Sequence, residues 1–197
     1  MKRSSGAGRG GGEVVNRASL FYVMNPDFSK NHFELFGFKP GFAINVAALD
    51  IAYREVQREV HPDRFATATD AEKRLAAQWA TQANGAYRTL KSPLNRGRYL
   101  LQLNGIDTEE ERNTAMPLEF LVQQMEWREA LDEARGSAQV ESLHAAVGRH
   151  HDEALRSLQQ MLDERRDYPA AAQQVRALMF VERFAADVDE RREALET

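Results

Sequence analysis

The chain has 197 residues, of which 43% are hydrophobic and 28% charged, and it contains no cysteine. This hydrophobic content supports a packed core and excludes global disorder, and the length suits one domain or two small ones. The lack of cysteine excludes disulfide scaffolds, thiol nucleophiles, zinc ribbons and cysteine-ligated iron–sulfur centres. No segment approaches the roughly 20 apolar residues of a membrane span, and residues 1–12 lack the apolar core of a secretory signal, so we expect a cytoplasmic protein.

The net charge of −4 is distributed unevenly along the chain. Residues 1–105 contain 15 Lys and Arg against 9 Asp and Glu, which gives +6, and residues 106–197 contain 11 against 21, which gives −10. This asymmetry predicts two surfaces that meet different partners. A nucleic-acid partner would need a basic stripe with interleaved aromatic residues, and the sequence offers no such stripe, so we expect none.

Residues 1–30 are expected to form a flexible tail, because Gly, Ser and Arg dominate residues 1–12. The pattern Gly6-x-Gly8-x-x-Gly11 matches a dinucleotide-binding fingerprint, but no strand can precede it, so the match carries little weight. Beyond the tail the periodicity is helical throughout. Asn31 can cap a short helix that Gly37 ends.

Two long helices follow. The first is capped by Asn45 and ends before Pro62, and one apolar stripe runs along it: Val46, Leu49, Tyr53, Val56 and Val60. The second is expected to begin with Asp70 as its cap and to present a second apolar stripe: Ala71, Leu75, Trp79, Ala83, Ala86 or Tyr87, and Leu90. Pro93 suits the first turn of a short helix through Leu103.

A polar linker is expected at 106–116, including the carboxylates of residues 109–111, and three more helices after it. These helices are predicted at 117–134, 137–166 and 169–195, separated by Gly136 and by Tyr168-Pro169. Three antiparallel helices with short connections form a small bundle. The predicted fold is all-α, with one module at 31–105 and a three-helix bundle at 117–197.

The tripeptide His61-Pro62-Asp63 joins the two long helices, next to a group of basic and polar residues: Arg54, Gln57, Arg58 and Arg64. One interpretation is an ordinary turn. Another is a catalytic dyad of His61 and Asp63, although no nucleophile or Gly-rich turn lies near them in the sequence.

The segment from Phe33 to Leu103 resembles a J domain, because a basic helix ends in His-Pro-Asp and an antiparallel helix ends in residues 84–90, Asn-Gly-Ala-Tyr-Arg-Thr-Leu. The resemblance implies that the His-Pro-Asp loop docks on a DnaK-type chaperone and stimulates its ATPase. Pro62 would limit the freedom of the loop before docking, and Asp63 could pair with an arginine. Arg54 and Arg58 could steer the helix toward an acidic groove.

The helix from Pro117 carries apolar residues on two opposite faces. One face suits the bundle core: Phe120, Trp127, Leu131 and Ala134. The other is bordered by carboxylates and needs a second cover: Leu118, Leu121, Val122 and Met125. This second face packs against the first module or forms an exposed binding patch.

The segment 120–133 resembles the scaffold-binding helix of the HscB family, J-type co-chaperones of iron–sulfur cluster assembly, and 93–105 resembles that family's Pro-x-x-Arg-x-x-Tyr-Leu-Leu-x-x-x-Gly segment. The resemblance implies that an IscU-type scaffold protein binds this set: Leu121, Val122, Met125, Glu126, Glu129, Glu133 and Phe180. Phe180 could equally be a core residue. Gly97 departs from the alanine usual there, and Gly85 lies inside a helix; each is expected to cost about 1 kcal/mol. The lack of cysteine indicates the bacterial type.

Three histidines, His144, His150 and His151, raise the hypothesis of a metal site. Two of them are seven residues apart and two are adjacent, which is poor ligand spacing on a helix, so no metal and no cofactor is expected. The leading hypothesis is a monomeric co-chaperone that stimulates an HscA-type ATPase and delivers an IscU-type scaffold. The alternatives are a J-domain co-chaperone with another client and a small hydrolase using His61 and Asp63.

Overall fold

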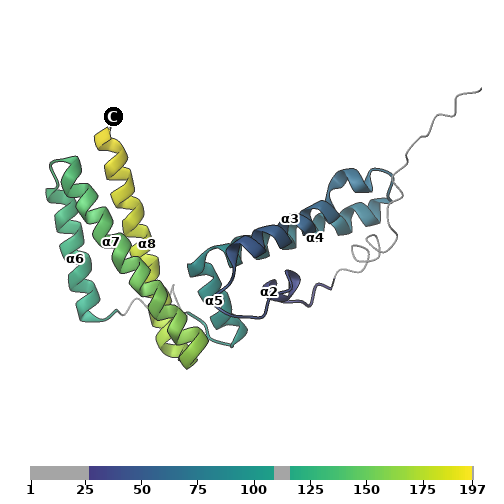
Figure 1. Cartoon of the computed structure of the whole chain (residues 1–197), viewed down its shortest axis with the longest axis horizontal. Helices are drawn as coiled ribbons and strands as arrows, with labels where there is room; N and C mark the ends of the chain where they lie inside the picture. The colour runs from purple at the N-terminus through teal and green to yellow at the C-terminus, as the bar shows by residue number, and fades with distance from the viewer. Residues whose placement is uncertain (1–26, 109–115, 197) are drawn as a thin grey trace, which may run out of the picture.

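The computed structural model describes residues 27–108 and 116–196, and every regular element in these ranges is helical. The elements are α2 (His32–Leu35), α3 (Val46–Val60), η1 (Pro62–Phe65), α4 (Asp70–Lys91), α5 (Pro93–Leu103), α6 (Leu118–Glu133), α7 (Ser137–Gln159), η2 (Gln160–Arg165) and α8 (Tyr168–Glu196). Figure 1 shows two arms: the hairpin of α3 and α4 with α2 beside it, and the group of α6, α7 and α8. The predicted all-α fold is confirmed.

Local capping explains where the helices begin. Asn31 forms a capping box with Glu34 at the start of α2, and the Asn45 side chain accepts the Ala48 N–H at the start of α3. The predicted cap of α4 was wrong by one residue. Thr69, rather than Asp70, caps this helix, because its hydroxyl accepts the N–H of Glu72 and the Glu72 carboxylate bonds back to Thr69. The predicted α4 stripe was wrong at its first position, because Ala71 is exposed. Ala76, which the predicted stripe did not include, is buried.

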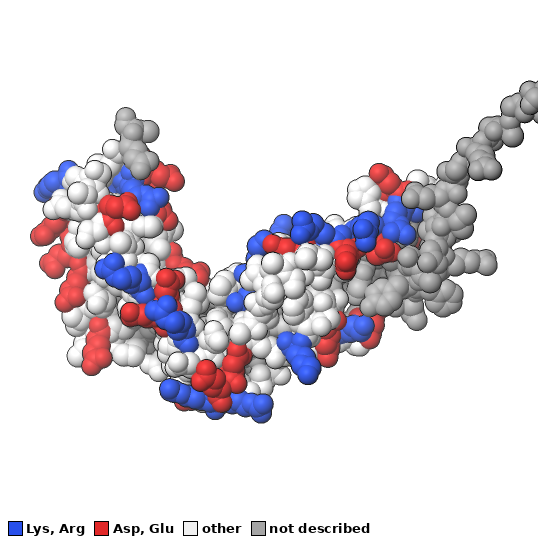
Figure 2. Space-filling model, in the orientation of Figure 1, with Lys and Arg blue, Asp and Glu red and all other residues white. Residues whose placement is uncertain are grey.

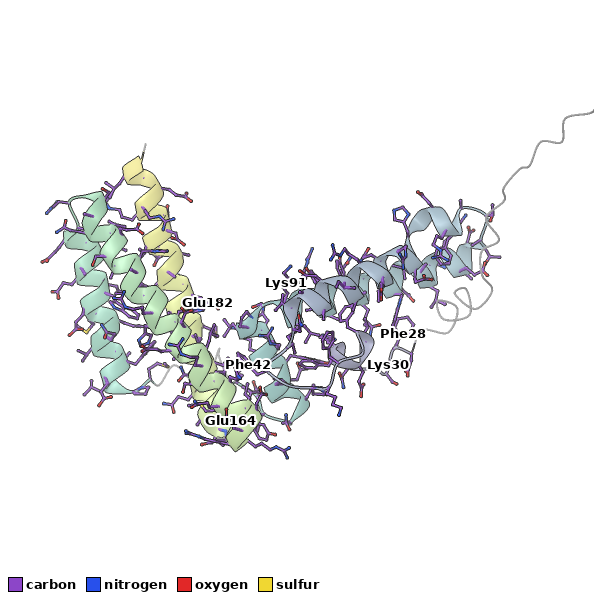
Figure 3. The ribbon with its side chains drawn as sticks, in the orientation of Figure 1. Phe28, Lys30, Phe42, Lys91, Glu164 and Glu182 are labelled. Carbon is purple, nitrogen blue, oxygen red and sulfur yellow. The ribbon has the colours of Figure 1, made fainter. Side chains whose placement is uncertain are left out.

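The predicted tail up to residue 26, with its glycine pattern, and residues 109–115 of the predicted linker lie outside the described residues. Contacts with the first arm begin ahead of residue 31, because the Phe28 ring meets Trp79 edge-on with centroids 5.7 Å apart (Figure 3). At the other end of this arm, Ile106 packs against the core, and Arg176 of α8 donates a hydrogen bond to the Thr108 carbonyl at 2.9 Å.

One hydrophobic core runs from the first arm into the second. It combines α2, α3, α4 and α5 with the end of α7, η2 and the beginning of α8. Its fully buried large members include Phe33, Leu49, Leu90, Leu101, Leu158, Val175 and Leu178. A shared apolar core is removed from water as one unit, so the base of the bundle and the first arm stabilise each other. The arms therefore meet through packed side chains rather than through the chain connection alone.

Gly97 of α5 lies at the closest approach in this junction. A Cβ atom placed there would be 3.0 Å from Leu158 Cδ2 and 3.5 Å from both Phe42 Cε2 and Val175 Cγ2. The sequence alone marked this glycine as a helix-weakening departure from alanine. The structure gives it a physical reason, because α5 meets the base of α7 and α8 where a side chain would crowd its neighbours.

Asp163 ties the same junction together with hydrogen bonds. It lies in η2, a π-helical turn, and its two carboxylate oxygens accept the backbone N–H groups of Phe42 and Ala43 at 2.7 and 2.9 Å. Buried Arg96 donates to the Leu90 carbonyl and lies over the Phe42 ring, 5.0 Å from its centroid (Figure 3). Burial lowers the pKa of Arg96, and the Asp163 carboxylate acts in the opposite direction.

A second, smaller core holds α6 to the upper parts of α7 and α8. Its buried members are Trp127, Ala134, Val140, Leu143, Val147, Val181, Phe184 and Val188. Trp127 stacks on Phe184 with ring centroids 5.7 Å apart, and meets His150 edge-on at 5.0 Å. The predicted core face of this helix is confirmed, since Trp127 and Ala134 are buried and Phe120 and Leu131 pack against the same cluster.

Candidate docking surfaces

The turn between α3 and α4 presents His61 and Asp63 at the far end of the first arm (Figure 1). His61 ends α3, and its Nδ1 accepts the backbone N–H of Asp63 at 3.3 Å. The same nitrogen is 3.5 Å from Asp63 Oδ2, and the two side chains are 59% and 90% exposed. Pro62 opens η1 with a φ that suits the first turn of a helix. The local backbone thus holds both polar side chains outward.

The basic residues near this turn differ in how free they are. Arg54 and Arg58 are exposed on α3, and the Nε of Arg54 donates to the Asp50 carbonyl at 3.1 Å. Arg64 is half-buried and pairs with Glu59 at 3.2 Å. Lys and Arg side chains line the upper edge of this arm in Figure 2. Arg54 and Arg58 therefore offer the more accessible positive charge.

Gln57 is held within the hairpin. Its amide Nε2 donates to Asn84 Oδ1 at 2.6 Å, and the Tyr53 hydroxyl donates to the same oxygen at 2.7 Å. Asn84 belongs to the segment 84–90 that resembles the J-domain pattern. These bonds fix α3 against α4, so Gln57 contributes to the shape of the surface behind the His61 turn.

A second network ties the opposite end of the hairpin. The Tyr87 hydroxyl donates to Asp50 Oδ1 at 2.8 Å, and Lys91 Nζ lies 3.1 Å from the same oxygen (Figure 3). Hydrogen bonds from Tyr87 and then Lys91 hold the pKa of Asp50 below its ordinary value. Contact with the Tyr87 hydroxyl and with Asp50 raises the pKa of Lys91. Both shifts favour the charged pair that joins α3 to α4.

The geometry gives the catalytic dyad little support. His61 and Asp63 are surrounded by solvent, whereas acid–base and nucleophilic groups work best in sites that exclude water. Two of the other histidines make separate pairs along the bundle, His144 with Asp189 at 3.3 Å and His151 with Glu182 at 3.4 Å. Within the described ranges, no three His, Asp or Glu side chains gather as a metal site would require.

The outer face of α6 is exposed. Leu118 and Met125 are 75% and 70% exposed, and Leu121 and Val122 are each more than 40% exposed. The alternative in which this face packs against the first arm is wrong. Figure 1 places α6 on the side of the bundle away from α3 and α4, with α7 and α8 between them. Exposed apolar side chains gathered on one helix face are typical of a protein-binding surface.

Carboxylates border this apolar face. Glu126, Glu129 and Glu133 are exposed on α6, and the Gln123 amide donates to Glu126 Oε2 at 3.1 Å. Acidic side chains also line the outer edge of this arm in Figure 2. Phe180 of α8 is half-buried and meets Phe120 edge-on with centroids 6.4 Å apart. Its ring packs partly against α6, so its burial is intermediate between that of a core residue and that of an exposed binding residue.

Comparison with known proteins decides the family. A model of the HSCB C-terminal oligomerisation domain matches residues 116–189. The chain is 52% identical over 170 residues to a co-chaperone protein HscB homolog of Burkholderia multivorans, an alignment covering 85% of this chain and 97% of that protein. The chain belongs to the HscB co-chaperone family.

Solved structures of HscB proteins have the same architecture. The chain matches the chaperone HscB from Vibrio cholerae with a TM-score of 0.76 and 35% identity, over 84% of this chain and 99% of that one. It matches the human co-chaperone protein HscB with a TM-score of 0.81 and 29% identity, over 85% and 84% of the two chains. The resemblance inferred from residues 33–103 and 120–133 is confirmed: the HscB fold is a J domain followed by a C-terminal helical domain.

Family membership also bears on the broad role. The relatives that the chain matches are named co-chaperones. A solvent-exposed His61 turn is consistent with a docking role of this kind. No helix in the described part of the chain has the length and apolar content needed to cross a membrane.

Two features of this HscB chain could not be found in the sequence. Asp163 contacts Phe42 and Ala43 across about 120 positions, and no local pattern marks such a pair. The second feature is an apolar pocket behind His61, which exists only because α3, η1 and α4 meet there. The alanines of α4 at positions 76, 77 and 80 are the feature of the sequence that relates to this pocket.

Proposed function

We propose that this HscB protein is an adaptor that stimulates the ATPase of an HscA-type chaperone and delivers an IscU-type scaffold protein to it. The observation that carries the proposal is the presence of two exposed and chemically different surfaces, the His61–Asp63 turn and the α6 face, on arms that share one hydrophobic core. On this proposal the chain acts as a monomer, and a measurement of its molar mass in solution tests this. On this proposal it catalyses no reaction itself.

The His61 turn suits a chaperone partner with an acidic groove and a nearby arginine. Asp63 is almost fully exposed, so its carboxylate can accept charge-assisted hydrogen bonds from a guanidinium. Arg54 and Arg58 add positive charge along α3 and favour rapid encounter with an acidic surface. Binding that prefers the hydrolysis-competent state of the chaperone would shift its population toward that state.

The α6 face suits the scaffold. Its apolar centre would be removed from water on binding, and its acidic border would select a basic rim on the partner. Because one packed core joins the two arms, a bound scaffold stays close to a bound chaperone, which raises its effective concentration there.

Replacement of His61 by glutamine tests the chaperone half of the proposal. The wild-type chain is expected to stimulate the ATPase of the purified HscA-type chaperone, and His61→Gln to lower the stimulation at least about tenfold, equivalent to about 1.4 kcal/mol. His144→Gln, a histidine on α7 far from the turn, is the matched control and should stimulate normally. Absence of stimulation by the wild type would refute the co-chaperone mechanism.

Replacement of Leu121, Val122 and Met125 by serine tests the scaffold half. Loss of apolar area at the centre of an interface costs about 1 kcal/mol or more per anchor, so we expect affinity for the IscU-type scaffold, measured by calorimetry, to fall at least about 100-fold. Ile51→Ser removes a similarly exposed apolar side chain on α3 and should leave this affinity unchanged. If the triple variant binds the scaffold as tightly as the wild type, the α6 face is not the scaffold-binding surface and this half of the proposal fails.

A further inference from the structure

A pocket of about 530 Å³ lies directly behind the His61 turn, where the end of α3, η1 and the first half of α4 meet. Most of its wall is apolar, and its lining residues are Gln57, Val60, His61, Phe65, Ala66, Lys73, Ala76, Ala77 and Ala80. This volume lies in the range of about 300–1,000 Å³ that is usual for pockets that bury a ligand. The pocket is large enough for more than one apolar side chain.

The walls of the pocket are fixed by residues that belong to the core. Val60, Phe65 and Ala76 are buried at its base, and the Gln57 amide is held by Asn84. The space exists because α4 presents methyl groups at 76, 77 and 80 rather than larger side chains. A pocket whose walls are already ordered binds a partner with little further loss of conformational entropy.

Two features of the pocket indicate what it binds. His61 forms part of its wall, so a protein that covers His61 and Asp63 also covers the pocket. Lys73 stands at its edge, is exposed, and makes no ion pair among the described residues. An apolar space beside one free cation fits a segment that carries a bulky apolar side chain next to a carboxylate.

We propose that this pocket receives an apolar side chain from a segment of the DnaK-type chaperone, with a nearby carboxylate of that segment bound to Lys73. The inference rests on the proposed function, because the chaperone reaches the pocket only when it docks on the His61 turn. It adds an apolar anchor to an interface otherwise made of charged and polar groups. Apolar anchors in preformed pockets dominate the energetics of many interfaces.

Site-specific crosslinking tests which molecule enters the pocket. Because the chain lacks cysteine, Ala77→Cys can carry a single benzophenone label, and Ala71→Cys labels an exposed position on the same helix outside the pocket. With the ATP-bound HscA-type chaperone, position 77 is expected to crosslink to a chaperone peptide with an apolar residue beside Asp or Glu. Crosslinks from position 77 only to this chain, to its residues 1–26 or a second copy, would overturn the proposal, as would their absence.

Filling the pocket separates this inference from the proposed function. Ala77→Phe is expected to weaken chaperone binding about tenfold, and Ala71→Phe, the same change outside the pocket, to leave it unchanged. Lys73→Glu, at an exposed position, tests the pocket independently without disturbing the fold. We expect it to weaken chaperone binding about fivefold. If both pocket variants bind normally while His61→Gln loses stimulation, the pocket proposal fails and the proposed function stands. If the wild type fails to stimulate, both fail.

Discussion

Replacement of Trp127 by alanine is expected to lower the free energy of unfolding of the α6 region by about 3–5 kcal/mol, the usual cost of removing a buried tryptophan. Trp127 is only 7% exposed, stacks on Phe184 and meets His150 edge-on. It is the largest side chain of a core with eight buried members, so little else can fill the space that it leaves. The helix that carries the candidate scaffold surface would lose its main anchor.

The effect should be confined to the second core. Hydrogen exchange measured by mass spectrometry is expected to show faster exchange in α6 and unchanged protection in α3 and α4, because these helices belong to the other core. Trp127→Phe keeps an aromatic ring against Phe184 and serves as the control, with an expected loss of about 1–1.5 kcal/mol. Equal loss of protection in both arms would contradict two separable cores.

The helices could be predicted because their signals are local. Asn31, Asn45 and Ser92 cap helices through bonds to residues two or three positions away, and Gly105 follows α5 with φ +73°. The cap of α4 was misplaced because Thr69 and Asp70 are both good caps. The capping box of Thr69 with Glu72 decides between them, and this spacing was readable in the sequence.

The candidate surfaces were predictable only where their chemistry lies on one helix face. The apolar face of α6 follows from helical periodicity, but whether another element covers it depends on packing between distant segments. Gln57 illustrates the same limit, because its side chain could point to solvent or to Asn84, and only the pairing of α3 with α4 decides. The pocket behind His61 needs three elements in place at once.

The junction between the arms was the least predictable part. Helix propensity alone predicts that Gly97 weakens its helix by about 1 kcal/mol. Propensity concerns α5 alone, whereas position 97 faces Leu158 and Val175, which come more than 60 residues later in the chain. A glycine that lowers the stability of its own helix can allow that helix to pack closely on another element. Which of these two effects is larger depends on the tertiary packing.

Replacement of Gly97 by leucine is therefore expected to destabilise the protein by about 3 kcal/mol, because overpacking a dense interior forces side chains and backbone to move. A Cβ atom already lies 3.0 Å from Leu158, and the rest of a leucine side chain would have to displace Phe42 or Val175. Gly97→Ala should change stability by less than about 1 kcal/mol, since its gain in helix propensity opposes the crowding. Urea denaturation followed by circular dichroism measures both variants.

Gly85 provides the matched control for this prediction. It also lies inside a helix, α4, but is exposed, and a Cβ there would meet no atom within 4 Å. Gly85→Leu is therefore expected to stabilise the protein by about 0.5–1 kcal/mol through helix propensity alone. Opposite signs for leucine at positions 97 and 85 would demonstrate that close packing of α5 on α7 and α8 requires a glycine. Stabilisation by both substitutions would mean that the two arms are not packed tightly at this point.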